Sequence, residues 1–239
     1  MIKGLIFDYG GTLDTKAMHW ATMIWQAYVR QQVPVTYEQF WEAYVHTERM
    51  LGRNPIIQKD FTFRQTLETK VQMQLDYLER ARAQGDEGAK IVDDLYKRTV
   101  ETTKESAQVL RQLHERYPIA IVSNFYGNLS VVLREFGFEG LYDHIIESAV
   151  VGVRKPDPTI FAMGVKALGM EPGEVMVVGD SLEKDIIPAR EVGCLTAHYA
   201  PSQPRSLALA DNPVVIHDLR DLLENISYNY NKTNTETLY

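Results

Sequence analysis

The sequence predicts an α/β protein with a doubly wound parallel sheet and an α-helical bundle inserted into it. Two observations support this prediction. From residue 104 onward, short apolar runs typical of buried strands alternate with amphipathic helices, as in a parallel sheet. Between residues 15 and 103, apolar residues recur only at helical spacing. A chain of 239 residues, 45% of them hydrophobic, is long enough for this core and an insertion.

We expect a core over residues 1–14 and 104–226, a helical insert over 15–103, and a polar C-terminal tail over 227–239. The first buried strand ends at Asp8. The later core elements are expected in this order: a helix over Lys104–Arg116, a strand over Ile119–Val122, a helix over Leu129–Phe136, a short strand over Asp143–Ile146, a helix from the Asp157 cap to Leu168, a strand over Val175–Val178, a helix over Leu182–Val192, and strands over Leu195–His198 and Val214–Ile216.

The insert is expected to hold four amphipathic helices. The first covers residues 17–32, and Thr36 opens the second with a capping box. A third is centred on Phe63–Leu78, and a fourth covers Ile91–Tyr96 after a break bounded by two glycines. Most of the aromatic side chains in these helices are expected to form the core of a small bundle.

A glycine turn follows the first strand directly. Asp8 is succeeded by Tyr9, Gly10, Gly11 and Thr12. Glycines let backbone N–H groups approach an anion closely, so Gly11 and Thr12 are candidate phosphate-binding residues. Asp8 itself is placed as a nucleophile or a metal ligand would be.

Three later segments place further polar groups near strand ends. Ser123 and Asn124 follow the second strand, Lys155 precedes a proline, and Asp180 follows the strand over 175–178, with Asp185 soon after. In open α/β sheets, ligands bind at the carboxyl ends of the strands. We therefore expect these side chains to meet Asp8 at one edge of the sheet.

The four motifs, in this order and spacing, resemble those of the haloacid dehalogenase superfamily, most of whose members are phosphohydrolases. The resemblance covers Met1 to about Leu223 and makes the insert a cap over the site. It implies that Asp8 is the nucleophile, that Ser123 and Asn124 bind phosphate, and that Lys155 is a catalytic charge clamp. It also implies a Mg²⁺ site made by Asp8, the Gly10 carbonyl and Asp180, with Asp185 as a ligand, acting through water or orienting Lys155.

One position departs from the phosphatases of that superfamily, which carry a second Asp where this chain has Gly10. That Asp protonates the leaving group and later activates water, a contribution of about 10²–10⁴-fold. The Gly10 carbonyl remains, so we expect the metal site to persist. His19 is a candidate replacement acid and base because it titrates near neutral pH, or else it caps a helix. Lys16 is a candidate substrate-binding cation.

The function expected first is a Mg²⁺-dependent hydrolase of a small phosphorylated metabolite, acting through an aspartyl-phosphate on Asp8. The first alternative is a phosphometabolite-binding or regulatory protein without turnover. The second is cleavage of a C–P or C–halogen bond. Relatives that cleave C–P bonds use a cap lysine to form a Schiff base, and the available lysines are Lys16, Lys59, Lys70, Lys90 and Lys97. The sequence does not indicate the substrate, because side chains of the insert would select it.

The composition of the chain argues against some classes of binding partner. The net charge of −7 without a dominant basic cluster argues against nucleic acid, and no apolar run approaches membrane-spanning length. The N-terminus leads straight into the first strand without a signal peptide, so we expect a cytoplasmic protein. Cys194 is the single cysteine, which excludes an intrachain disulfide and favours a buried structural thiol. The oligomeric state is left open.

Overall fold

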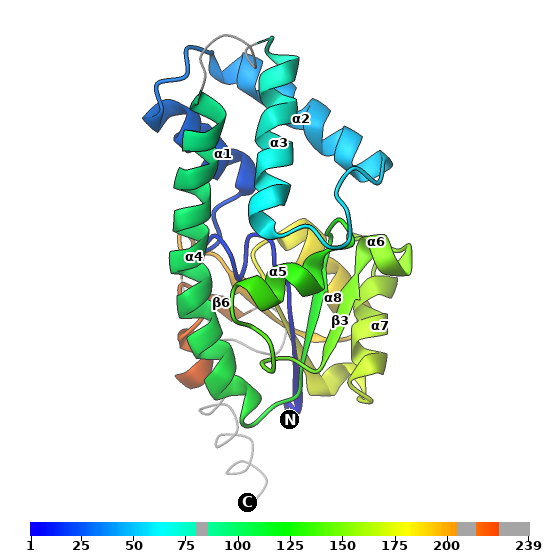
Figure 1. Cartoon of the computed structure of the whole chain (residues 1–239). Helices are drawn as coiled ribbons and strands as arrows, with labels where there is room; N and C mark the ends of the chain where they lie inside the picture. Colours follow the sequence, from blue (N-terminus) through cyan, green and yellow to red (C-terminus); the bar gives the residue numbers. More distant parts are fainter. Residues whose placement is uncertain (80–85, 205–213, 225–239) are drawn as a thin grey trace, which may run out of the picture.

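The computed structural model describes residues 1–79, 86–204 and 214–224, and it confirms the α/β class (Figure 1). Within these residues, six parallel strands form one sheet in the order β3-β2-β1-β4-β5-β6. The order runs outward from β1 in both directions, so the carboxyl end of β1 lies at the topological switch point. The strands are β1 (Gly4–Phe7), β2 (Ile119–Ser123), β3 (His144–Glu147), β4 (Val175–Gly179), β5 (Leu195–Tyr199) and β6 (Val214–Ile216).

The central strands β1, β2 and β4 are buried along their whole length, which explains why they are nearly continuous apolar runs. Leu5 and Phe7 pack in one hydrophobic cluster, whereas Ile6 packs in a second cluster on the opposite face. The core helices are α5 (Leu129–Glu135), α6 (Ser148–Val151), α7 (Thr159–Ala167) and α8 (Ile187–Val192). The helix expected over Leu182–Val192 is divided, because a π-helical turn, η2 (Leu182–Ile186), precedes α8; a 3₁₀ turn, η1 (Pro172–Glu174), precedes β4.

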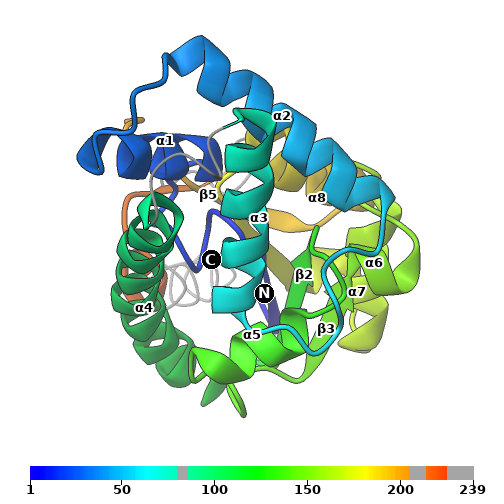
Figure 2. The same ribbon diagram turned by 45° about the horizontal axis from the view of Figure 1, so that its top comes forward.

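The helical insert contains no strand among its described residues, 15–79 and 86–103. It consists of α1 (Trp20–Arg30), α2 (Tyr37–Arg53), α3 (Phe63–Tyr77) and the first half of α4 (Glu87–His114). The predicted capping box of Thr36 with Gln39 is present. Figure 2 shows these helices in front of the edge of the sheet.

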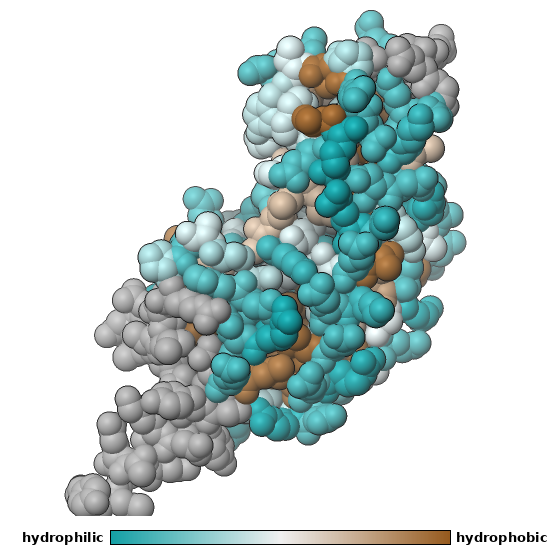
Figure 3. All heavy atoms as spheres, turned by 90° about the vertical axis from the view of Figure 1, so that its left-hand side faces the viewer, coloured by the Kyte–Doolittle hydropathy of each residue, from teal (hydrophilic) through white to brown (hydrophobic). Residues whose placement is uncertain are grey.

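The boundary expected at residue 104 lies inside α4, a single helix where the sequence predicted two. No glycine or proline interrupts the chain between residues 89 and 117, so nothing local breaks the helix. Figure 3 shows the side of the molecule that lies on the left in Figure 1, where α4 runs, and this face is largely hydrophilic. The division into core and insert at residues 14 and 104 stays a prediction.

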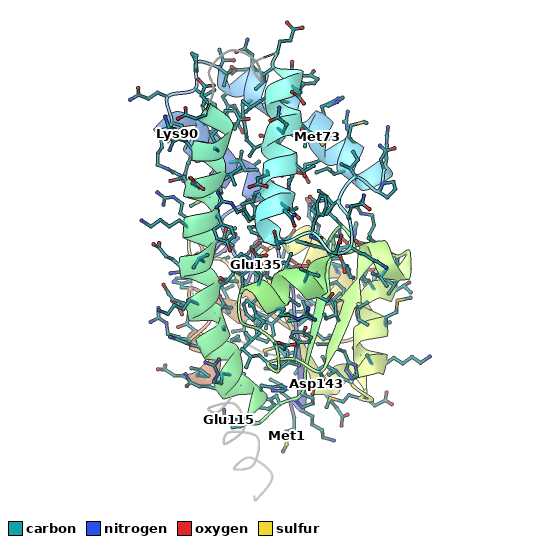
Figure 4. The ribbon with its side chains drawn as sticks, in the orientation of Figure 1. Met1, Met73, Lys90, Glu115, Glu135 and Asp143 are labelled. Atoms are coloured by element: carbon teal, nitrogen blue, oxygen red, sulfur yellow. The ribbon has the colours of Figure 1, made fainter. Side chains whose placement is uncertain are left out.

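Glu135 fixes the insert to the core (Figure 4). Its side chain projects from α5, where Oε2 accepts a hydrogen bond from the Phe63 N–H at 2.5 Å and Oε1 accepts one from the Tyr96 hydroxyl at 2.9 Å. The carboxylate therefore satisfies a free N–H at the start of α3 and also holds α4.

Three further predictions remain to be compared with the structure. Cys194 is buried, and burial raises the pKa of its thiol to about 11, as expected of a structural cysteine. No described helix is long and apolar enough to cross a bilayer. The tail predicted over 227–239 lies outside the described residues.

Candidate active site

The carboxyl edge of the sheet brings together the side chains that the sequence placed there. Asp8 follows β1, and its Oδ1 atom accepts a hydrogen bond from the Ser123 hydroxyl at 3.1 Å and one from Lys155 Nζ at 2.6 Å. Lys155 also lies 2.6 Å from Oδ1 of Asp185. All four residues are almost completely buried, so these charges interact with little screening by water.

Lys155 is positioned through its backbone. The Asn124 carboxamide donates to the Lys155 carbonyl at 3.0 Å and accepts from the Lys155 N–H at 2.9 Å. Burial alone would lower the pKa of the Lys155 ammonium, but the Asp185 and Asp8 carboxylates outweigh burial and raise that pKa. Lys155 therefore remains a cation, and the Asn124 side chain is occupied in placing it.

Thr12 links two of the carboxylates. Its hydroxyl lies 3.2 Å from Oδ2 of Asp8 and 3.1 Å from Oδ1 of Asp180, and it accepts a hydrogen bond from the Asp180 N–H at 3.0 Å. Gly11 has a φ of +106°, and a Cβ there would lie 2.4 Å from Oδ1 of Asp180. The glycine is therefore required both by its backbone conformation and by this close approach.

The segment after β4 positions the other two acids: Asp180 precedes the π-helical turn, and Asp185 lies within it. The Ser181 hydroxyl caps this turn by accepting from the Lys184 N–H at 3.1 Å, which leaves the Asp180 side chain free of the capping role. Oδ2 of Asp185 accepts from the Ser181 N–H at 3.1 Å, so Asp185 is oriented toward Lys155.

The acidic cluster suits a divalent cation. Asp8, Asp180 and Asp185 each offer a carboxylate oxygen, and these three oxygens lie within 4.8 Å of one another. Burial raises the pKa of Asp8 to about 7 and that of Asp180 to about 6, with Lys155 opposing the shift. Oxygen donors are what Mg²⁺ prefers, and its charge would offset the repulsion between the acids. The residues present therefore fit the expected metal.

Gly10 leaves open space where the second Asp of the related phosphatases stands. A Cβ built on Gly10 meets no atom within 4 Å, and the φ of Gly10 lies outside the left-handed range. The residue is exposed and lines the same cleft as Asp8. An Asp at position 10 would therefore meet no steric obstacle at its Cβ.

His19 lies in the cleft wall as the N-cap of α1. Its Nδ1 atom accepts a hydrogen bond from the Ala21 N–H at 3.2 Å, so the capping interpretation is the one observed. In the neutral ring, this contact leaves the proton on Nε2. Burial, followed by the charge of Lys184, lowers the pKa of His19. The proposed catalytic role of His19 stays a prediction.

Among the five candidate lysines, Lys70 alone lines the cleft. Its Nζ atom lies 2.7 Å from Oε1 of Glu48 and donates to the Tyr126 hydroxyl at 3.0 Å. Burial opposes the charge, but Glu48 and then Tyr126 raise the pKa of Lys70 well above its ordinary value. Lys16, in contrast, pairs with Glu105 at 2.8 Å outside the cleft, which contradicts the suggestion that Lys16 binds substrate there.

Asp14 was not identified from the sequence. It is fully buried, and it accepts hydrogen bonds from the Gly11 N–H at 2.7 Å and from the Trp20 indole at 2.9 Å. Burial raises its pKa to about 8. A second acid only six residues after Asp8, at the end of the glycine turn, was the available signal. The side chain supports the glycine turn and ties it to the start of the insert.

A cleft of about 810 Å³ lies between the core and the insert. The core side contributes Asp8, Gly10 and Lys155, and the insert contributes Tyr44 and Leu67 among others. The acidic cluster therefore opens into a space large enough for a small ligand.

Comparison with known proteins agrees with this geometry. The family model for haloacid dehalogenase-like hydrolases matches residues 2–193. A haloacid dehalogenase-like hydrolase domain-containing protein 3 from Bos taurus is 31% identical over 140 residues, covering 56% of this chain and 56% of that protein. A Mus musculus protein of the same name is covered over 41% of its length, so the chain spans about half the length of these relatives.

Two other relatives match over most of the chain. A glyceraldehyde 3-phosphate phosphatase from Pyrococcus abyssi is 28% identical, covering 83% of this chain and 82% of that protein. A phosphoglycolate phosphatase from Pectobacterium atrosepticum is 26% identical, covering 95% of this chain and 93% of that protein.

A solved structure shows the same fold. The L-2-haloacid dehalogenase RSc1362 superposes with a TM-score of 0.60 at 23% identity, covering 95% of this chain and 99% of that one. The matching family model, the strand order and the cluster around Asp8 lead to one conclusion: the chain belongs to the haloacid dehalogenase-like hydrolase family.

Proposed function

We propose that this protein is a Mg²⁺-dependent phosphohydrolase of a small phosphorylated metabolite, with Asp8 as the nucleophile. The observation that carries the proposal is the cluster of Asp8, Lys155, Asp180 and Asp185, in which only Asp180 is partly exposed and which faces a cleft at the switch point of the sheet. The relatives named as glyceraldehyde 3-phosphate and phosphoglycolate phosphatases support a small phosphoester as the substrate.

In this proposal, a carboxylate oxygen of Asp8 attacks the phosphorus atom and the ester oxygen leaves with the bonding electrons. Bound Mg²⁺ would neutralise charge on the phosphoryl group. Lys155 and the Ser123 hydroxyl, which now contact Asp8, lie where they can bind phosphoryl oxygens. Water then cleaves the aspartyl-phosphate and returns Asp8 to its free form.

Because position 10 carries no acid, the rate of phosphate transfer should depend strongly on the leaving group. Acyl and aryl leaving groups need no proton, so they should transfer phosphate to Asp8 readily. Alkoxide leaving groups should be slow, and hydrolysis of the aspartyl-phosphate should also be slow, because Gly10 offers neither an acid nor a base.

We propose that His19 partly compensates as a neutral hydrogen-bond donor. With its proton on Nε2, the ring can donate to a leaving-group oxygen from the cleft wall. For Nε2 to accept a proton, the ring proton would first have to move to Nδ1, and His19 would then lose its hydrogen bond from the Ala21 N–H. The proposed role is therefore to stabilise negative charge on the leaving oxygen.

A quench-flow experiment with acetyl phosphate and Mg²⁺ tests the proposal. We expect a rapid burst of acid-stable, Asp8-linked phosphate followed by slow release of inorganic phosphate, and neither in Asp8→Asn. A wild-type protein that binds phosphorylated metabolites but releases no phosphate would contradict the proposal and favour a binding protein, the alternative suggested by Gly10.

Cleavage of a C–P bond through a Schiff base is disfavoured by the environment of Lys70. A lysine must lose its proton to attack a carbonyl group, whereas Glu48 holds Lys70 as an ammonium ion. Cleavage of a C–halogen bond is suggested only by solved structures below 25% identity, whose likeness shows the fold alone.

A further inference from the structure

The cleft contains more positive charge than the phosphoryl site uses. Four acidic and five basic side chains line the cleft in an acidic protein of net charge −7. Lys155 is paired with Asp8 and Asp185, and Lys70 is paired with Glu48. The remaining bases are Arg53, Arg154 and Lys184.

These three bases have no carboxylate partner within 4.0 Å among the described residues. Other Lys and Arg side chains outside this cleft, such as Lys16, Arg30 and Arg64, are paired with a carboxylate. The C-terminal end of α2 carries a partial negative charge of only about half an elementary charge, which is too small to neutralise three bases. The cleft wall therefore carries three cations that no described carboxylate neutralises.

The three bases come from both sides of the cleft. Arg53 ends α2 of the insert, whereas Arg154 and Lys184 belong to the core, next to Lys155 and Asp185. Arg154 lies against the end of α2, because a Cβ on Gly52 would lie 3.6 Å from its Nη1 atom. Lys184 lies close enough to His19 to contribute to the lowered pKa of that ring. A ligand bound at Asp8 would therefore meet cations from the core and the insert together.

Resting on the proposed phosphohydrolase function, we infer that the substrate carries a second anionic group, and that Arg53, Arg154 and Lys184 bind it. The phosphoryl group would lie at Asp8 and the second anion, a carboxylate in the simplest case, would lie toward Arg154. Arginine suits this role because its planar guanidinium binds a carboxylate through two parallel hydrogen bonds. These three side chains are exposed to solvent, and a neutral sugar or alcohol phosphate would offer them no anionic partner.

The test uses two ligands that differ in one charge and cannot be hydrolysed. Phosphonoacetate carries a phosphonate and a carboxylate, whereas ethylphosphonate is of similar size without the carboxylate. Titration calorimetry of the full chain with Mg²⁺ should show that phosphonoacetate binds at least about tenfold more tightly, the effect of about 1.4 kcal/mol.

Arg154→Gln should then weaken phosphonoacetate binding by about tenfold and leave ethylphosphonate binding within about twofold. Lys184→Gln should show the same selectivity. Lys97→Gln removes an exposed charge from α4 away from the cleft, and it should change neither affinity. Equal affinity of the wild-type protein for both ligands would overturn the inference, as would equal losses for both in Arg154→Gln.

Failure of the inference and failure of the proposed function are distinguishable. Binding of both ligands with equal affinity, together with turnover of acetyl phosphate, would refute the second anion and leave the phosphohydrolase standing. Selective binding of phosphonoacetate without any phosphate release would support the anion site and refute the catalytic proposal. No measurable binding of phosphonoacetate at millimolar concentration would overturn the inference.

Discussion

The Nζ atom of Lys155 lies 2.6 Å from Oδ1 of Asp8, and the side chains of both residues are less than a tenth exposed. This pair joins the first motif of the chain to a loop 147 residues later. Because Asp185 lies at the same distance from the ammonium, one buried cation contacts two buried carboxylates and offsets part of their charge. The site is thus assembled around a charge that cannot be removed without leaving acids uncompensated.

Lys155→Met should therefore destabilise the protein as well as abolish phosphate transfer. Removing one partner of a buried ion pair costs about 3–5 kcal/mol, because the remaining charge stays desolvated. Urea unfolding monitored by circular dichroism should show this loss, whereas Lys97→Met on the surface of α4 should change the midpoint little. An unchanged midpoint in Lys155→Met would mean that the acids are protonated or hydrated in solution.

Gly10→Asp should raise steady-state turnover of alkyl phosphates by about 10²-fold, because it restores an acid and a base beside Asp8. The structure accommodates the change, since a Cβ at this position meets no neighbour within 4 Å. Gly10→Ala is the matched control, which fills the same space without a carboxylate and should leave the rate near wild type. Equal rates for all three proteins would show that the acid comes from another residue.

Mg²⁺ affinity should increase as the pH rises from about 5 to about 8. The pKa of Asp180 is raised to about 6 and that of Asp8 to about 7 in the metal-free protein, so both carboxyls carry protons at the acidic end of this range. Because the metal binds the ionised form, binding at pH 6 must displace protons. Calorimetry in two buffers of different ionisation enthalpy measures this release, which should diminish in Asp180→Asn. Affinity independent of pH would be inconsistent with a site formed by these carboxyls.

His19→Ala should impair hydrolysis in proportion to the basicity of the leaving group. We expect little effect with acyl phosphates and a loss of up to about 10²-fold with alkyl phosphates, because only the latter need a donor at the leaving oxygen. His19→Asn separates catalysis from folding, since Asn is a strong N-cap and should keep α1 stable. A uniform loss across leaving groups, recovered in His19→Asn, would assign His19 to capping alone.

Much of the core could be predicted because its central strands are buried on both faces and are therefore nearly continuous apolar runs, as in Val175–Gly179. The polar residues that directly follow or end these strands, Asp8, Ser123 and Asp180, were found for the same reason. The single helix α4 was missed because the α/β alternation suggested a new element at residue 104, although no residue there breaks a helix.

Other parts of the site depend on how distant segments are placed, which local pattern does not contain. Lys70 resembled four other lysines until α3 was located beside Tyr126. The proximity of Arg154 to the end of α2 depends on the packing of two segments about 100 residues apart, which no local pattern indicates. The part played by Asp14 required the position of the Trp20 indole, which belongs to the insert.

Because α4 is one unbroken helix, its length fixes the spacing and the relative rotation of the insert and the core. An α-helix advances about 1.5 Å and turns about 100° with each residue. Adding one residue near the middle of α4 would therefore rotate its first half, and the helices packed on it, against the sheet edge. Substitutions on the surface of this helix leave that spacing intact, whereas a single insertion or deletion would move Tyr44, Lys70 and Arg53 out of register with Asp8. Length, more than composition, is the property of this helix on which the cleft depends.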